Sequence, residues 1–401
     1  MINKENKPRI RTFGSVRGKK VIVAMSGGVD SSVAAALLKR DGFDVVGVHL
    51  KFWSEGKSSA ENRCCTLESE KRARIVAKKL NIPFYVFNFE KEFKRKVVGY
   101  FLKEYRAGRT PNPCVVCNKE IKFGLLIEKA LKLGEDFVAT GHYARLGREI
   151  PNPKSQTPNK PKTQNPKPIK LFKAKDENKD QSYFLWQLNQ RQLNRVLFPI
   201  GNYTKPQVRA LAKKFKLPVA ETPESQEVCF IKNKTNDFLK KYIKIKIGEI
   251  RDKQGRLLGE HQGLCFYTIG QRKGIGLPGG PYYVLDKDIK KNILVVTQDE
   301  KDLLRKDLIV GNVNWISGKK PRLREGYSGQ AKMPIKVMAK IRYRNKGASA
   351  VIKKAAVGEP RQGRENRKIK VIFSKPQRAI TSGQSAVFYR GGELLGGGVI
   401  E

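Results

Sequence analysis

Apolar and polar residues near the start of the chain follow a strand–helix–strand order. Residues 21–25 are an apolar, β-branched run, which predicts a buried strand. Residues 31–40 are rich in Ala and Leu and predict a helix, and the apolar run at 45–50 predicts the next strand. Two strands joined through a helix form a βαβ unit, so we expect a parallel sheet in an α/β domain.

Two more units extend this pattern. Helices are predicted over 68–80 and 121–133, and each is followed by a short apolar strand, at 84–87 and at 137–140. The N-terminal domain is therefore predicted to be an open α/β sheet. His142 follows the end of the last of these strands, where ligands of such sheets gather, which makes it a candidate for a binding role.

The composition changes after this domain core. Residues 151–168 consist mainly of Pro, Asn and Lys and contain nothing that could build a core, so we expect a disordered or extended loop. The stretch "KDQSYFLWQL" at 179–188 predicts a helix. A second helix is predicted after Thr204, which can cap it, with Pro206 in its first turn.

Short strands separated by glycine turns predominate from about residue 248. Hairpins are predicted over 250–263 and 282–298. From 307 to the end, alternating stretches predict a small antiparallel barrel or sandwich, with a basic hairpin loop at 353–370. The 401 residues are enough for two or three domains, each with its own core.

The charge balance points to a polyanionic partner. The chain has 82 Lys and Arg against 37 Asp and Glu, a formal net charge of +45. A field of this sign attracts nucleic acid, although a generally lysine-rich proteome would produce the same excess. No run of 18 apolar residues is present, and the basic N-terminus lacks the apolar core of a signal peptide. We therefore expect a cytoplasmic protein without a membrane partner.

The segment "SGGVDSS", residues 26–32, lies directly between the first strand and the first helix. Glycines there let the backbone turn tightly and bring N–H groups to an oxyanion, beside the positive end of the helix dipole. It is neither a Walker A loop nor a G-x-G-x-x-G dinucleotide motif. It resembles the pyrophosphate loop (PP-loop) of the ATP-pyrophosphatase superfamily. That resemblance implies ATP cleavage between the α and β phosphates, with Asp30 near the Mg2+.

Two cysteines in "NPCVVCNKEIKFG", residues 112–124, have a C-x-x-C spacing that metal sites, redox pairs and nucleophiles all use. The segment resembles the signature Asn-Pro-Asp-x-x-Cys-Asn-x-x-Ile-Lys-Phe of the tRNA-specific 2-thiouridylases. Further matches follow in order along residues 18–401, among them "ATGHYAR", "KDQSYFL", "CFI" and "SGQSAVFY". The resemblance implies ATP-dependent conversion of the wobble uridine of tRNA to 2-thiouridine, with release of AMP and pyrophosphate.

The resemblance also implies a domain order. A basic tail (1–17) would precede a PP-loop, Rossmann-like catalytic domain (18–225) that contains the disordered insert 151–170. A small central domain (226–304) and an antiparallel β-barrel that helps to bind tRNA (305–401) would follow. The implied partners are tRNA and a sulfur donor, either a cysteine desulfurase or a sulfur-relay protein.

Individual residues are assigned from the matched motifs. Cys117 corresponds to the nucleophile, and Cys229 to the cysteine that carries sulfur as a persulfide and then forms a transient disulfide with Cys117. The implied ATP contacts are Ala24, Met25, Ser26, Gly27, Gly28, Val29, Asp30, Ser31, Leu50 and Gly141. The implied contacts to tRNA or its target base are Asn112, Pro113, Cys114, His142, Lys179, Asp180, Gln181, Arg342, Tyr343 and Gln384.

One difference from the family signature leaves the route of sulfur transfer open. Cys114 stands where the signature commonly has Asp, so Cys114, Cys117 and Cys229 could together hold a [4Fe-4S] cluster that carries the sulfur. A thioredoxin-type pair is disfavoured, because that motif follows a strand directly and opens a helix, and two prolines precede the cysteines here. Another PP-loop adenylating enzyme acting on tRNA is the further alternative. Cys64, Cys65 and Cys265 are expected to have no catalytic role.

Overall fold

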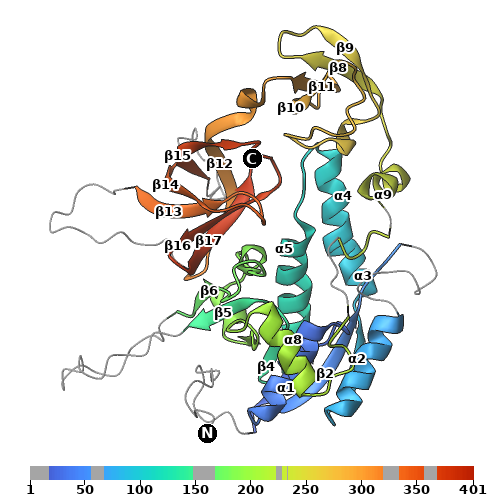
Figure 1. Ribbon diagram of the computed structural model, residues 1–401, viewed down its shortest axis with the longest axis vertical. Coiled ribbons are helices and arrows are strands. Elements are labelled where there is room, and N and C mark those ends of the chain that lie inside the picture. The colour runs from blue at the N-terminus through green and yellow to red at the C-terminus, as the bar shows by residue number, and fades with distance from the viewer. Residues whose placement is uncertain are drawn as a thin grey trace, which may run out of the picture.

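The computed structural model describes residues 18–55, 67–147, 168–222, 228–232, 234–318, 334–355 and 368–401. Three parts follow one another along the chain: a helix-and-strand part, a small β part at the top of Figure 1, and a β-barrel. Within these described ranges, no helix has the length and apolar character needed to cross a membrane.

The N-terminal part is built on a five-stranded parallel sheet in the order β3-β2-β1-β4-β7. Its strands are β1 (Lys20–Ala24), β2 (Asp44–Lys51), β3 (Phe84–Asn88), β4 (Phe137–Thr140) and β7 (Val196–Leu197). The predicted α/β sheet and its first four strands are confirmed. Strand order reverses between β1 and β4, and ligands of open α/β sheets bind at such a point, outside the carboxyl ends of the strands.

Helices cover both faces of this sheet (Figure 1). One face carries α1 (Val29–Arg40), α2 (Leu67–Lys79) and α8 (Lys205–Lys214). The other carries two long helices, 90–106 and 113–132, each made of consecutive segments. These segments are α3 (Glu90–Phe93), η1 (Lys94–Val98), α4 (Gly99–Arg106), α5 (Pro113–Cys117), η2 (Asn118–Leu125) and α6 (Leu126–Lys132).

The second long helix begins at Pro113 and not at the predicted position 121, because a proline suits the first turn of a helix. Its η2 segment is π-helical, a geometry that frequently marks functional sites. Gln192, in the short helix α7 (Gln190–Leu193), holds this segment from outside. Its Nε2 donates to the carbonyl oxygens of Lys119 at 3.1 Å and Phe123 at 2.7 Å.

The central part is a four-stranded sheet in the order β10-β11-β8-β9, reached through helix α9 (Thr235–Tyr242). Strands β8 (Gly248–Asp252) and β9 (Leu257–His261) form one antiparallel pair, and β10 (Tyr283–Asp288) and β11 (Ile293–Thr297) form the other. Both predicted hairpins are therefore confirmed. The parallel pairing of β11 with β8 joins them.

The C-terminal part is a closed antiparallel barrel, as predicted, because β17 pairs with both β16 and β12. Its strands are β12 (Leu304–Trp315), β13 (Ile335–Lys340), β14 (Ala348–Lys354), β15 (Ile369–Arg378), β16 (Ser385–Arg390) and β17 (Glu393–Ile400). A hairpin from the N-terminal part, β5 (Ala144–Gly147) and β6 (Lys170–Lys173), adds to β17 and extends the barrel sheet. The N-terminal part and the barrel thus share one sheet.

The predicted helix over 179–188 is wrong. Only a 3₁₀ turn, Ser182–Phe184, forms there. The side chains of this segment have distant partners that a helix would not satisfy: Tyr183 OH donates to Ser385 O at 2.9 Å, and Trp186 Nε1 donates to Ser385 Oγ at 3.0 Å. The helix predicted after Thr204 is confirmed as α8, and Gln207 accepts the Thr204 N–H at 2.9 Å.

Some expectations fall outside the described residues. These are the basic tail 1–17, the insert as far as residue 167, Cys64 and Cys65, and residues 356–367 of the basic hairpin loop. The last residues of the expected insert are described, and they are ordered: Ile169 is buried, and β6 begins at Lys170.

Candidate active site

The phosphate loop joins β1 to α1 at the point where the strand order reverses. Gly27 has a φ of +76°, and a Cβ there would collide with the carbonyl oxygen of Ser69, so the loop requires glycine at this position. Gly28 precedes the helix and has no side chain with which to cap it. The N–H groups at the start of α1 are therefore not hydrogen-bonded to a capping side chain, which leaves them suited to bind an anion.

Serine hydroxyls shape this loop from within. Ser26 N–H donates to Ser31 Oγ at 3.2 Å, and Ser31 Oγ donates to Gly28 O at 3.2 Å. Ser32 Oγ donates to the same carbonyl at 2.9 Å. Ser31 and Ser32 are buried and Ser26 is exposed, so the loop is held from its protein side and open on the other.

The other expected ATP residues lie around the same sheet edge. Gly141 follows β4, and a Cβ there would lie 2.6 Å from Ser31 N, so the two loops touch. Leu50, near the end of β2, is buried. Ala24 ends β1, and the buried Met25 and Val29 flank the loop, so these residues can reach a ligand mainly through the backbone.

A buried lysine that sequence reasoning missed meets the phosphate loop. Lys205, the first residue of α8, is 7% exposed, and its Nζ lies 2.8 Å from both carboxylate oxygens of Asp30. Tyr143 OH donates to Asp30 Oδ1 at 2.7 Å. The only sequence signal near Lys205 was the capped helix start, which says nothing of what its side chain contacts.

The cysteine pair lies in α5. Cys114 is exposed, whereas Cys117 is 6% exposed and belongs to a large apolar cluster that includes residues of all three parts. Cys229 is half-buried and packs against the same cluster. Its neighbour Phe230 is fully buried, edge-on to Phe101 at a ring distance of 5.2 Å, which anchors the cysteine's segment. One premise used against a thioredoxin-type pair is wrong, because the two cysteines do open a helix; no strand directly precedes it.

The three cysteines do not fit an iron–sulfur cluster. Across the described part of the chain, no three Cys, His, Asp or Glu side chains are grouped so that they could hold a metal ion. Cys114 is exposed on the first turn of α5, while Cys117 points into the apolar cluster one turn later. This arrangement gives no support to the cluster alternative raised by Cys114.

Asn118 connects the cysteine helix to the segment 180–184. Its Nδ2 donates to Phe184 O at 3.2 Å, and the Phe184 ring contacts Tyr343 of the barrel at a centroid distance of 4.5 Å. Asn118 is 3% exposed, and no described residue donates to its Oδ1. A buried amide oxygen beside Cys117 is thus left as an acceptor for a donor from outside the chain.

Asp180 and Gln181 tie the N-terminal part to the barrel. Asp180 Oδ1 accepts the N–H groups of Ala174 and Ser182, both at 3.1 Å, and Ser182 Oγ lies 3.1 Å from Tyr389 OH. Gln181 Oε1 accepts the Tyr143 N–H at 3.0 Å. Lys179 is half-buried one residue before them. Asp180 therefore has a structural role, and its expected place near the target base stays a prediction.

Barrel residues hold the chain just before the cysteine helix. Gln384 Nε2 donates to Thr110 O at 3.0 Å. Arg342 Nη2 donates to Ala379 O at 2.7 Å, in the loop that leads to Gln384. Asn112 and Pro113 are buried next to this contact. Of the expected tRNA residues, Asn112, Pro113 and Cys114 thus lie at the start of α5, and Gln384 contacts the chain just before it. Tyr343 is connected to α5 through Phe184 and Asn118, and Asp180 and Gln181 belong to the segment that Asn118 contacts.

His142 is placed differently from the other expected tRNA residues. It is 9% exposed, its Nδ1 lies 2.7 Å from Thr140 Oγ1, and its ring contacts Phe123 and Phe198. Burial, together with the nearby Lys122, holds its pKa well below the usual value. A neutral imidazole follows at pH 7, so His142 has no charge with which to attract a phosphate.

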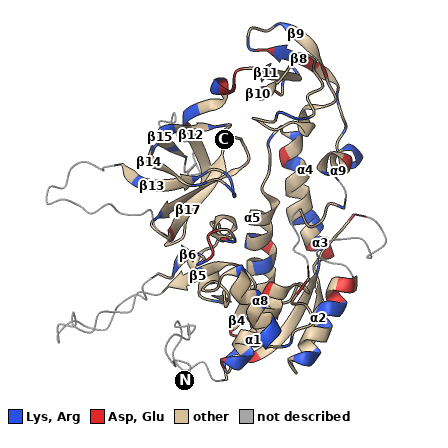
Figure 2. Ribbon diagram, viewed as in Figure 1, with Lys and Arg blue, Asp and Glu red and all other residues tan. Residues whose placement is uncertain are grey.

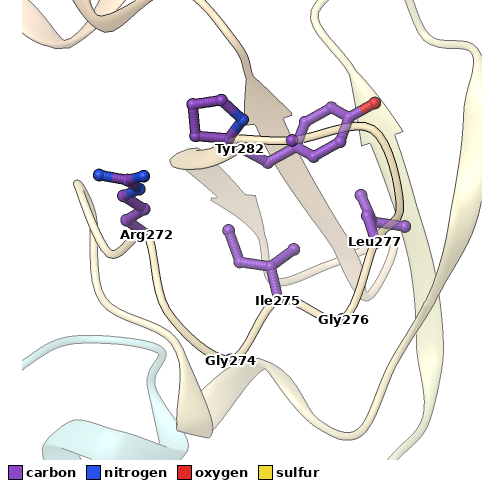
Figure 3. Close-up of a pocket in the computed structure, with 8 residues that line it drawn as sticks. Arg272, Gly274, Ile275, Gly276, Leu277 and Tyr282 are labelled. Atoms are coloured by element: carbon purple, nitrogen blue, oxygen red, sulfur yellow. The ribbon is translucent and has the colours of Figure 1, made fainter.

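A cavity of about 310 Å³ lies in the central part (Figure 3). Arg272, Ile275, Leu277 and Tyr282 line it together with glycines and Pro281. None of the expected site residues takes part in it. The candidate active site is instead the edge of the parallel sheet and the adjoining start of α5.

Family models match consecutive parts of the chain. A tRNA methyl transferase HUP domain matches residues 19–233, a tRNA methyl transferase PRC-barrel domain matches 236–298, and an aminomethyltransferase beta-barrel domain matches 305–400. These three ranges correspond to the α/β part, the central sheet and the barrel.

Full-length relatives are named for thiolation and not for methyl transfer. The tRNA-specific 2-thiouridylase MnmA 2 of Thermoanaerobacter sp. (strain X514) is 46% identical over 389 residues, 95% of this chain and 98% of the relative. The tRNA-specific 2-thiouridylase MnmA of Carboxydothermus hydrogenoformans is 45% identical over 393 residues, 96% and 98% of the two chains. MnmA 1 of Caldanaerobacter subterraneus is 47% identical over 389 residues, 95% and 98%.

Proposed function

The chain belongs to the tRNA-specific 2-thiouridylase family, and from this premise we propose that it converts the wobble uridine of tRNA to 2-thiouridine with consumption of ATP. The observation that carries the proposal is the similarity to the 2-thiouridylases over almost the whole of both chains. Figure 2 adds a supporting feature, since Lys and Arg are spread over the helices and strands of all three parts. The domain limits 18–225, 226–304 and 305–401 belong to the same proposal.

The first step is adenylation of the base. The C2 oxygen of uracil attacks the α-phosphorus of ATP, the bond to the β-phosphate breaks, and pyrophosphate leaves with the electron pair while the N3 proton passes to solvent. The N–H groups of the loop around Gly27 and Gly28 bind the phosphates in this proposal, and Gly141 leaves room beside them. Asp30 would hold Mg2+, which neutralises phosphate charge when bound.

The second step exchanges the activated oxygen for sulfur. A sulfur donor, a cysteine desulfurase or sulfur-relay protein, leaves Cys229 as a persulfide. Its terminal sulfur attacks C2 and AMP leaves. The Cys117 thiolate then attacks Cys229 Sγ, so the sulfur–sulfur bond breaks, the base keeps the outer sulfur and recovers its N3 proton, and a Cys117–Cys229 disulfide forms. A dithiol reductant reopens that disulfide. Support comes from the packing around both cysteines: α5 contacts η1, and Phe230, next to Cys229, packs edge-on against Phe93, which directly precedes η1.

The target base binds at the start of α5 in this proposal. Asn112, Pro113 and Cys114 line it, and the unsatisfied Oδ1 of Asn118 accepts the N3–H of the incoming uracil. Tyr343 offers an aromatic face from the barrel, and Lys179, Arg342 and Gln384 contact the tRNA around it. A base must leave its stack to reach this place, as it does in other enzymes that modify bases. A cytoplasmic location belongs to the same proposal, because tRNA and ATP are both available there.

Mass spectrometry of tRNA nucleosides tests the proposal. In a host that lacks 2-thiouridine, the intact chain should restore the modified base, and Cys117→Ser or Cys229→Ser should abolish it. Cys265→Ser, in the central part, is the matched control and should restore it. Absence of 2-thiouridine with the intact chain, together with tRNA-dependent ATP-to-pyrophosphate turnover that persists in both serine variants, would favour another PP-loop adenylating enzyme. Loss of 2-thiouridine in Cys114→Ser as well as in the other two serine variants would contradict the persulfide route and favour the cluster alternative.

A further inference from the structure

Lys205 pairs with Asp30 beside the phosphate loop and has no role in the reaction described so far. The Lys205 side chain is 9% exposed, and that of Asp30 is 31% exposed. The ammonium contacts both carboxylate oxygens at 2.8 Å. Burying an ammonium is costly unless it is paired, so the fold stabilises this charge with the one acidic residue of the α1 first turn.

The backbone of Lys205 is fixed, and its side chain is the part that can move. Lys205 N–H donates to Asp176 Oδ2 at 2.8 Å, and Asp176 Oδ1 accepts the N–H groups of Asn178 and Lys179. Helix α8 then packs along α1 in a shared apolar cluster. The start of α8 is therefore held beside the start of α1, and a four-carbon stem carries the ammonium within reach of the loop.

Asp30 has a second partner that does not depend on Lys205. Tyr143 OH donates to Asp30 Oδ1 at 2.7 Å, and Tyr143 is itself held by the hydrogen bond from its N–H to Gln181. The carboxylate consequently keeps its place when the ammonium leaves. An anion more highly charged than a carboxylate, bound at the N–H groups of the loop, would compete with Asp30 for the same ammonium.

We propose that Lys205 is a catalytic residue of the adenylation step. Before ATP binds, its ammonium pairs with Asp30; when ATP is bound, the side chain moves so that the ammonium contacts the phosphates and stabilises the pyrophosphate leaving group. As the bond between the α and β phosphates breaks, negative charge grows on the β-phosphate oxygens, and a cation at this place is worth more in the transition state than in the ground state. The same move frees the Asp30 carboxylate for Mg2+. This inference rests on the proposed function.

Magnesium-free pyrophosphate is the probe, because its affinity reports the contribution of the Lys205 ammonium to phosphate binding without bound metal and without the adenylation reaction. Calorimetric titration of the full chain compares wild type, Lys205→Met, Asp30→Asn and the double variant. Lys205→Met should bind pyrophosphate about 10- to 100-fold more weakly, the range of one charge-assisted hydrogen bond. Asp30→Asn should bind it about tenfold more tightly, because the ammonium no longer has a competing carboxylate. The double variant should bind as weakly as Lys205→Met.

One control variant and three outcomes separate this inference from its alternatives. Lys214→Met removes an exposed lysine from the same helix and should bind as wild type does. Wild-type affinity in Lys205→Met would overturn the inference, and so would an Asp30→Asn variant that binds no more tightly than wild type. The second comparison holds even if Lys205→Met fails to fold. A wild-type chain that binds neither pyrophosphate nor ATP would instead overturn the proposed function.

Discussion

The Asn118 side chain has one group that is hydrogen-bonded within the protein and one that is buried without a partner among the described residues. It follows Cys117 directly, its Nδ2 is committed to Phe184 O, and its Oδ1 is buried with no donor among the described residues. A buried acceptor left unsatisfied costs stability, commonly about 1–3 kcal/mol. A cost of this kind is typical of a ligand-binding position, and a hydrogen bond from the N3–H of uracil would satisfy the acceptor.

Replacing Asn118 by Leu should therefore affect the tRNA substrate and not ATP. We expect kcat/KM for tRNA to fall about 10- to 100-fold, because one hydrogen bond to the base is lost. The affinity for ATP should stay at the wild-type value. Steady-state thiolation assays and ATP titration measure the two quantities. Lys119→Ala, an exposed change at the next residue, serves as the control; equal tRNA kinetics in both variants would contradict the role of Oδ1.

Among the elements, the helix that carries Cys117 depends on a partner outside itself. Its π-helical segment leaves carbonyl oxygens in an unusual geometry, and Gln192 donates to two of them. The same Gln192 side chain accepts the Asn189 N–H at 3.1 Å and so caps α7. Gln192 thus joins a short helix to the one that positions the cysteine.

Gln192→Ala should loosen the cysteine helix. The free energy of unfolding is expected to fall by about 1–3 kcal/mol, because two carbonyl groups and a helix cap lose their partner. Thiolation should slow, while ATP binding at the distant loop should be unchanged. Urea unfolding checks stability, with Arg191→Ala on the exposed side of the same helix for comparison. A Gln192→Ala protein as stable as that control would show that the π-helical segment holds without it.

At the scale of the whole molecule, the histidines make stability depend on pH. All three, His49, His142 and His261, have a pKa lowered chiefly by burial. His261 accepts the Gly263 N–H at Nδ1 and lies 3.1 Å from Asn292 O through Nε2, so protonation at Nδ1 would break a hydrogen bond. The folded chain therefore takes up fewer protons than the unfolded chain as the pH falls below about 6.5.

The free energy of unfolding should accordingly fall on acidification, because each histidine that stays neutral only in the folded state lowers it by up to about 1.4 kcal/mol per pH unit. Above about pH 7 both states are neutral at these residues, and the effect disappears. Urea midpoints at pH 7.5 and 5.5 measure it. His261→Gln should reduce the difference between the two midpoints; a wild-type chain equally stable at both values would exclude the effect.

Local sequence patterns were sufficient to predict much of the fold of this protein. The phosphate loop is a contiguous strand, turn and helix, so its residue order determines its shape, and glycine at 27 is required by a positive φ. The barrel strands alternate with the period of two that a half-buried sheet imposes, and the hairpin turns lie between them. The two site cysteines were proposed from motifs, and their role stays a prediction.

Contacts between distant segments were decided only by the tertiary structure. Lys205 and Asp30 are far apart in sequence, and nothing in either local pattern joins them. The turn at 182–184 replaces a predicted helix because Tyr183 and Trp186 find partners on the barrel, and β6 continues the barrel sheet through β17. Propensity and periodicity describe a segment by itself. Pairing and burial between segments depend on where the folded chain brings them, which is why the ammonium beside the phosphate loop could not be read from its sequence.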